Sequence, residues 1–270
     1  MVSDLRCRLD DLYAKYNRPE LVHPDPLEFL YRYRRAADRE IAGLVASSLA
    51  YGRVAQILKS VACVLERMHE PAEFLKNSSE SELLNTFRDF CHRFTSGSDL
   101  AVLLAGAGRA IERYGSLEAC FCSGLNPDHE TVTRALSRFS KKICLEYGAG
   151  PSYLLPDPDR GSACKRAFLF LRWMVRRDSV DPGGWSCVPV SKLVVPLDTH
   201  MFRIAGMMGF TARKQADLRA ALEITRHFRN VNPADPVKYD FVLTRFGIRN
   251  DMDCGDLQID LGSSGPGRRK

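Results

Sequence analysis

The 270-residue sequence predicts an all-α fold, in which helices carry almost all of the regular structure. Apolar residues recur at steps of three and four over most of the chain, which places them on one face of a helix. The β-like run Val188–Leu197 contains Pro189 and Pro196, which favour an extended connector over a central strand. The other Pro and Gly residues fall mainly between the helical runs, where they indicate loops.

Each expected helix has a local signal. Gly52 interrupts the apolar pattern of Ile41–Met68, so we expect two helices that meet near Tyr51–Arg53, or one broken helix. Ser98 or Asp99 can cap a helix that Gly115 ends. The further helices are expected at Glu80–Phe94, Ser98–Tyr114, His129–Tyr147, Ala163–Arg177, Thr199–Met208, Thr211–Arg229 and Pro236–Gly247.

Composition excludes several classes of protein. Hydrophobic residues make up 45% of the chain, too many for a wholly disordered protein. The longest apolar stretches, around Ile41–Ala50 and Leu100–Ala107, are about half of the ~20 residues that a spanning helix needs, so we expect no membrane association. The charged N-terminus lacks the apolar core of a signal peptide. Nine Cys without CxxC spacing indicate reduced thiols and a cytoplasmic protein, associated with the nucleoid at most.

The charge pattern permits a nucleic-acid partner without establishing one. The net charge is +6, and we expect the excess to gather on and after one segment, at Arg160, Lys165, Arg166, Arg172, Arg176 and Arg177. No phosphate-binding loop, HExxH, GxSxG or paired Cys/His spacing occurs, which argues against phosphoryl transfer, zinc hydrolysis and the common serine hydrolases. We expect neither a metal site nor a cofactor.

The first chemical candidate is Lys165, in the segment LLPDPDRGSACKR. A Pro/Asp/Gly turn should follow one helix, and a second helix should start near Ser162 with Lys165 in its first turn. The helix dipole opposes a cation there, which favours the neutral amine that a nucleophile needs. Backbone N–H groups of the turn can hold a phosphate together with Arg160, Gly161, Ser162 and Arg166. The alternative is a solvated lysine in an ordinary connector between helices.

Two further segments carry candidates. In PLDTHMFRIAGMMG, Asp198 stands where a helix N-cap is expected, and its carboxylate can accept a proton or stabilise positive charge. Arg203 on the same helix can hold a phosphate. In LASSLAYGRVAQI, Tyr51 and Arg53 lie at the helix break and can stack on or enter a duplex. The alternatives are a structural cap, an exposed helix charge and a core helix with an exposed turn.

Together the three segments resemble the helix-hairpin-helix DNA glycosylase superfamily. Its members have an Ile-Leu-Ser-Gln-Gln-Thr-like break (here LASSLAYGRVAQI), a Leu-Pro-Gly-Val-Gly-like hairpin with a catalytic Lys in bifunctional enzymes (here LLPDPDRGSACKR), and a Val-Asp-Thr-His-like segment with the essential Asp. PVKYDFVLTRFG is similar to the closing helix. Over nearly all of residues 1–250, the chain also resembles a bacterial family catalogued as uncharacterised.

The departures from this pattern are specific. The hairpin keeps only Gly161 of its glycines, and Ala50-Tyr51 replaces the Gln-Gln pair. Lys165 and Asp198 lie further apart in sequence than in most members, a spacing closest to that of the archaeal 8-oxoguanine branch. Cys254 stands alone after the closing helix, so the four-Cys iron–sulfur cluster of some members cannot form.

The resemblance implies two helical lobes with a cleft between them: residues 41–177 with the hairpin, and residues 1–40 plus 178–250, followed by a flexible tail at 251–270. It implies a monomer that excises a damaged base, for example an oxidised purine, from double-stranded DNA. Lys165 would form a Schiff base with the sugar and Asp198 would assist, giving glycosylase and AP-lyase activity. The alternative is a non-catalytic helix-hairpin-helix nucleic-acid-binding protein, which has no use for the Lys165–Asp198 pair. A third hypothesis is a helical domain that mediates protein–protein interaction.

Overall fold

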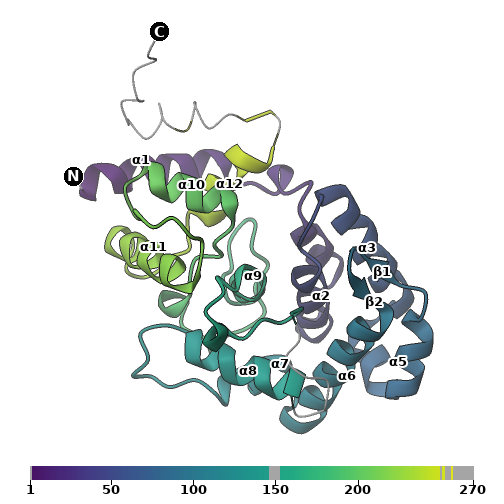
Figure 1. Cartoon of the computed structure of the whole chain (residues 1–270). Coiled ribbons are helices and arrows are strands. Elements are labelled where there is room, and N and C mark those ends of the chain that lie inside the picture. Colours follow the sequence, from purple (N-terminus) through teal and green to yellow (C-terminus); the bar gives the residue numbers. More distant parts are fainter. Residues whose placement is uncertain (1, 146–152, 250, 253–256, 258–270) are drawn as a thin grey trace.

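A computed structural model describes residues 2–145, 153–249, 251–252 and 257, and this part of the chain is mostly helical, as predicted (Figure 1). The helices are α1 (Val2–Tyr16), α2 (Ala36–Ser48), α3 (Val54–Met68), α4 (Pro71–Asn77), α5 (Glu80–Phe87), α6 (Gly97–Tyr114), α7 (Leu117–Cys122), α8 (Thr133–Leu145), α9 (Lys165–Val175), α10 (Thr199–Met207), α11 (Leu218–Val231) and α12 (Asp240–Ile248). Short 3-10 turns occur at Pro19–Leu21, Pro26–Arg32, Pro158–Arg160 and Val190–Lys192, and strands β1 (Cys91–His92) and β2 (Thr95–Ser96) form a hairpin.

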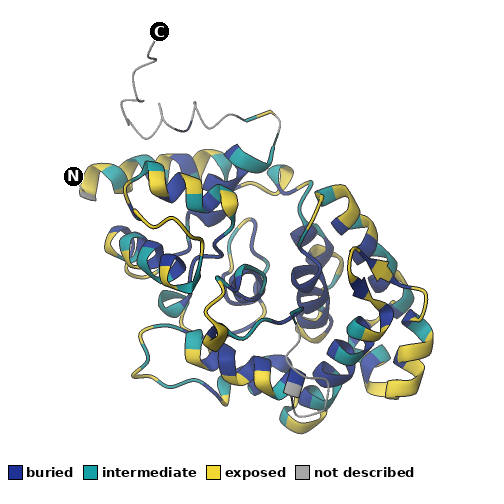
Figure 2. Cartoon of the chain, viewed as in Figure 1, coloured by how far each residue is buried: buried dark blue, intermediate teal, exposed yellow. Residues whose placement is uncertain are grey.

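Helices α2 and α9 are largely buried and pack against each other near the middle of the molecule (Figure 2). Helices α4 to α8 form one group, in which α6 contacts α5, α7 and α8. On the other side α1 packs against α11 and α12, and α10 packs against α12 (Figure 1). The first and last described helices are therefore neighbours.

The predicted break after α2 is confirmed as two separate helices. Helix α2 ends at Ser48, and α3 begins at Val54 with Arg53 as its N-cap residue. Gly52 between them has φ +97°, and a Cβ atom there would lie 2.7 Å from Cδ of Arg93 in the β1–β2 hairpin. Only glycine fits this close approach without a shift.

The predicted helix Glu80–Phe94 is wrong beyond Phe87. The chain leaves the helix there and forms the β1–β2 hairpin, in which Arg93 has φ +56°. Phe87, Phe90 and Phe94 have the spacing of a helix face, but Phe94 is 66% exposed at the hairpin turn. Ser96 then caps α6, because its side chain accepts the backbone N–H of Asp99.

Several other helix starts differ from prediction, and among these α2 begins at Ala36 rather than Ile41 and α12 at Asp240 rather than Pro236. Helix α8 begins at Thr133 rather than His129, and its predicted end at Tyr147 lies outside the described residues. Helix α9 begins at Lys165 rather than Ala163, because Cys164 has φ +47°. Helix α11 begins at Leu218 rather than Thr211, because Asp217 caps it by accepting the N–H of Ala220 at 2.8 Å. Helices α1, α4 and α7 were not predicted.

The prediction that positive charge gathers on and after the hairpin is wrong for two of the residues in that cluster. Arg172 on α9 and Arg176, the C-cap residue of α9, are 3% and 4% exposed. Arg172 binds Asp181 and Asp240, and Arg176 binds Asp181, with further contacts to Asp178 and Asp235 at 2.9 Å. Their charges are thus neutralised inside the molecule, where they join α9 to the loop after it and to the start of α12.

The prediction of reduced thiols agrees with the structure for six of the cysteines and is wrong for two. Cys122 and Cys187 are paired as a disulfide, with their Cα atoms 6.4 Å apart. Cys254 and the greater part of the predicted tail lie outside the described residues. No described helix combines the length and apolar character needed to cross a membrane. In the described ranges, no three His, Cys, Asp or Glu side chains are grouped so as to hold a metal ion.

Candidate functional site

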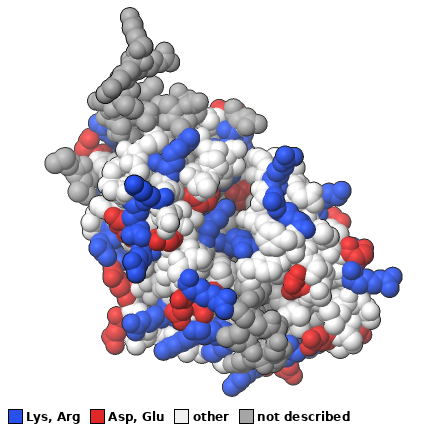
Figure 3. All heavy atoms as spheres, in the orientation of Figure 1, with Lys and Arg blue, Asp and Glu red and all other residues white. Residues whose placement is uncertain are grey.

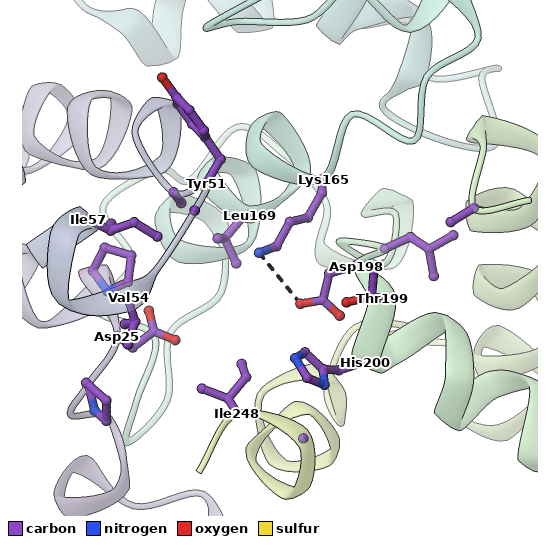
Figure 4. Close-up of a pocket in the computed structure, with 17 residues that line it drawn as sticks. Asp25, Tyr51, Val54, Ile57, Lys165, Leu169, Asp198, Thr199, His200 and Ile248 are labelled. Carbon is purple, nitrogen blue, oxygen red and sulfur yellow. Dashed lines mark ion pairs between the residues drawn. The ribbon is translucent and has the colours of Figure 1, made fainter. Parts of the chain in front are cut away.

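A pocket of about 560 Å³ lies where the break after α2, the start of α9, the start of α10 and the end of α12 meet (Figure 4). This volume suits a nucleoside-sized ligand. Its floor and walls come from distant parts of the chain: Pro24, Asp25, Pro26, Ala50, Tyr51, Gly52, Val54, Ile57, Lys165, Leu169, Leu197, Asp198, Thr199, His200, Ala216, Gly247 and Ile248.

The structure brings Lys165 and Asp198 together in this pocket. Nζ of Lys165 lies 3.6 Å from Oδ2 of Asp198, and the two side chains are 34% and 15% exposed (Figure 4). Lys165 is the first residue of α9, whose N-cap residue Cys164 makes no side-chain cap. An amine and a carboxylate that share one pocket wall at this distance can exchange a proton after a small adjustment.

The two carboxylate oxygens of Asp198 make different contacts. Its Oδ1 accepts the backbone N–H of Met201 at 2.8 Å, so Asp198 is the N-cap of α10, as predicted. Its Oδ2 faces Lys165. The cap fixes the carboxylate in the pocket, because rotation of the side chain would cost the hydrogen bond to α10.

Asp198 also influences a buried carboxyl group behind the pocket. Burial raises the pKa of Asp240 to about 6 against the opposing charge of Arg172, and the charge of Asp198 adds to the rise. Asp240 is 3% exposed and hydrogen-bonded to Arg172. The start of α12 is therefore electrostatically linked to the pocket.

His200 forms part of the pocket wall beside Asp198 (Figure 4). Its ring packs against Gly247 of α12 so closely that a side chain at position 247 would collide with it. The end of α12 thus supports the first turn of α10, from which both Asp198 and His200 extend.

The turn before α9 is closed by its own backbone. Gly161 has φ +81° and donates its N–H to the carbonyl of Pro158 at 2.8 Å, and Arg160 donates its N–H to Asp157 at 3.1 Å. These two N–H groups are therefore used within the turn. Arg160, Gly161 and Ser162 are exposed, and Ser162 pairs with Asp217 in an isolated bridge.

Arg166 has an internal position. Its guanidinium donates to the carbonyls of Ser48 and Tyr153 at 2.7 and 2.5 Å and lies 4.9 Å from the ring centroid of Tyr51. Burial lowers the pKa of Arg166 from its ordinary value. In this structure it joins the end of α2 to the segment before the hairpin instead of facing solvent.

Tyr51 does not point into the pocket. Figure 4 shows its side chain directed away from Lys165, and its hydroxyl donates to the carbonyl of His92 at 2.9 Å and contacts Thr95. Phe94 stacks on its ring with centroids 5.0 Å apart, and the ring centroid of Tyr153 lies 5.1 Å from that of Phe94. Phe94 is the exposed aromatic of this group, which sequence periodicity had assigned to a helix.

The remaining two predicted cations, Arg53 and Arg203, are exposed on α3's N-cap and on α10. The surface in Figure 3 is hollowed near its centre, where Lys or Arg atoms are visible within the hollow with Asp or Glu atoms beside them. The hollow has mixed charge and is not uniformly basic.

The sequence identified Lys165, Asp198 and Tyr51 among the residues that line the pocket, but not its apolar walls. Phe168, Phe170, Trp173 and Trp185 were aromatic candidates for a base pocket, but all four are buried in the core, and neither they nor Phe202 line the pocket. Aliphatic residues take this place, chiefly Ile57, Leu169 and Ile248, together with Asp25. No local motif marks Asp25, because its position depends on how residues 24–26 fold back beside α12.

Comparisons with known proteins give one result. A search of curated proteins and a search of solved structures found no match. One family profile matches residues 25–249, a range that includes every residue lining the pocket except Pro24. On the strength of that match over most of its length, the chain belongs to the family described as "Protein of unknown function (DUF2400)".

Proposed function

We propose that this protein is a DNA glycosylase with AP-lyase activity, which acts on double-stranded DNA that carries a damaged base. The observation that carries the proposal is the 3.6 Å separation of Lys165 Nζ and Asp198 Oδ2 in a pocket of about 560 Å³. The resemblance of the surrounding segments to helix-hairpin-helix glycosylases supports it. A module that only bound nucleic acid would not need a lysine and a carboxylate paired inside a pocket.

The proposed reaction uses both groups. Asp198 accepts a proton from Lys165, or stabilises positive charge on the sugar as the base departs. The neutral amine forms a bond to C1′ of the sugar, the glycosidic bond breaks, and the base leaves with its electron pair and takes up a proton. Opening of the sugar ring gives a Schiff base. Loss of a C2′ proton then expels the 3′ phosphate, and hydrolysis of the imine returns Lys165.

The surroundings support a role in holding DNA. The first-turn N–H groups of α9 have no side-chain cap and lie beside Lys165, so they suit a backbone phosphate next to the flipped nucleotide. Exposed Arg160, Arg53 and Arg203 can add phosphate contacts. We assign insertion into the base stack to Phe94 instead of Tyr51, because Phe94 is exposed and is backed by two rings.

The proposed architecture is the two-lobed one of the glycosylases, with residues 153–175 as the altered hairpin and its second helix. The pocket draws Ile57, Lys165 and Leu169 from the segment assigned to one lobe, and Asp25, Asp198 and Ile248 from the segments assigned to the other. This origin is what a cleft between the two lobes requires.

Borohydride trapping on duplexes with an abasic site, 8-oxoguanine or uracil tests the proposal. We expect a covalent adduct on the abasic duplex that is abolished in Lys165→Ala and retained in Lys76→Ala, an exposed lysine on α4 outside the pocket. Absence of an adduct and of base release on every duplex would overturn it. Tight duplex binding without an adduct would instead indicate the non-catalytic alternative.

A further inference from the structure

We propose that Asp25 selects the base, and that it selects a guanine-type edge, which presents two adjacent N–H donors. The inference rests on the proposed glycosylase function, because it names the kind of base that the same pocket accepts. It assigns a role to a carboxylate that comes from outside the three segments described above.

Asp25 lies across the pocket from the Lys165–Asp198 pair, directly before the 3-10 turn Pro26–Arg32 (Figure 4). Its Oδ1 accepts the backbone N–H of Leu27 at 3.0 Å. Its Oδ2 accepts a hydrogen bond from Arg245 at 2.7 Å. Arg245 is itself 2% exposed and lies 4.5 Å from the ring centroid of Phe241, so it is a rigid partner.

The carboxylate retains capacity for a ligand. An ionised carboxylate offers about four acceptor sites, of which these protein contacts use one on each oxygen. The side chain is 13% exposed, and in Figure 4 its oxygens lie on the pocket wall. Because both oxygens are already held, a ligand donor meets an acceptor that needs little reorganisation.

The other walls determine how a base would lie. Ile57, Leu169 and Ile248 provide flat aliphatic surfaces on which a planar heterocycle can pack. The sugar must reach Lys165 at one end of the pocket, so the base extends towards Asp25. The Watson–Crick edge of a purine is the edge furthest from its glycosidic bond, and it would therefore face the Asp25 oxygens.

Hydrogen-bond chemistry then separates the bases. A carboxylate only accepts, so it favours adjacent donors and repels acceptors. Guanine presents N1–H beside its N2 amino group. Uracil and thymine present one N–H between two carbonyl oxygens, and adenine and cytosine present an amino group beside a ring nitrogen that accepts. Only the guanine-type edge matches both oxygens of Asp25.

Excision rates on matched duplexes test this assignment. Duplexes with 8-oxoguanine and 8-oxoadenine carry the same damage at C8 but different Watson–Crick edges, and a uracil duplex supplies a third edge. We expect the wild type to release 8-oxoguanine at least about tenfold faster than the other two, and Asp25→Asn to reduce that preference to about threefold or less. Glu28→Gln, on the same 3-10 turn but outside the pocket, should keep the wild-type preference.

An abasic duplex separates failure of this inference from failure of the proposed function. It has no base for Asp25 to bind, so borohydride trapping of the wild type on it measures the proposed function alone. Release rates for Asp25→Asn, and for Asp25→Glu, which keeps the charge beside Arg245 but moves its oxygens, are compared between bases within each variant. The assignment to Asp25 is overturned if trapping by the wild type is normal and Asp25→Asn leaves the base preference unchanged. It is also overturned if trapping is normal but the wild type prefers another edge or releases no base from any duplex. Loss of trapping in the wild type overturns the proposed function instead.

Discussion

Lys165 and Asp198 could be found from sequence because each stands at a recognisable helix start. Asp198 precedes an apolar-faced helix and follows a proline-bounded connector, which is the local pattern of an N-cap. Asp25 also caps a helical turn, but nothing in its local pattern shows that it faces the pocket. Its place there, like those of Leu169 and Ile248, depends on the packing of distant chain segments. Tyr51 was located correctly at the break, but its side-chain direction is set by the unpredicted hairpin.

Asp198→Asn tests the division of labour between the two oxygens. Asn is as good an N-cap as Asp, so α10 and the melting temperature should change little, whereas loss of the charge should lower abasic-site trapping by about 10²- to 10⁴-fold. Asp217→Asn, at the equivalent cap of α11 outside the pocket, is the matched control and should leave trapping intact. Full activity in Asp198→Asn would contradict the assigned role.

Helices were predicted well as elements and less well at their boundaries. The apolar period identified α2, α3, α6, α10 and α12, because their buried faces are continuous. It failed at the β1–β2 hairpin, where phenylalanine spacing resembles a helix but the chain is fixed by tertiary contacts. His92 is one of these: it is fully buried and hydrogen-bonds Ser60 at 2.9 Å and the carbonyl of Tyr51 at 3.1 Å.

We expect buried His92 in the hairpin to make the stability of the fold depend on pH. Burial lowers the pKa of His92 from its ordinary 6.5, so the unfolded chain binds the proton first as the pH falls. The stability that His92 contributes is therefore present above pH 6.5 and declines below it, until the folded protein also becomes protonated. Urea unfolding at pH 7.5 and 5.5 should show a smaller loss on acidification in His92→Gln than in the wild type; equal losses would count against this account.

The packing of distant segments in the whole molecule was the hardest feature to predict from the sequence. Arg172 and Arg176 belong to a basic stretch in the sequence, yet they are buried with Asp178, Asp181, Asp235 and Asp240. Asp235 and Asp240 lie 59 and 68 residues along the chain from the arginines that they bind, so they cannot be recognised as partners from local charge. The same holds for the packing of α1 on α11 and α12, which closes the molecule around both ends of the described chain.

Asp181→Ala tests whether this ion-pair network holds α9 in place. Asp181 is fully buried and binds both arginines, so its removal leaves uncompensated charge and should lower the free energy of unfolding by about 3–5 kcal/mol. Asp89→Ala removes an exposed partner of Arg67 and should have little measurable effect. Urea unfolding at pH 7 measures both, and similar values for the two variants would argue against the network.

The pocket wall formed by residues 24–26 and residues 247–248 has a consequence for biosynthesis. Arg245, which binds Asp25 in the first of these segments, is made 220 residues after it. Until Arg245 is made, Asp25 lacks this partner, and the pocket lacks the wall that residues 247–248 provide. A nascent chain therefore cannot complete this pocket until residues 247–248 have been synthesised.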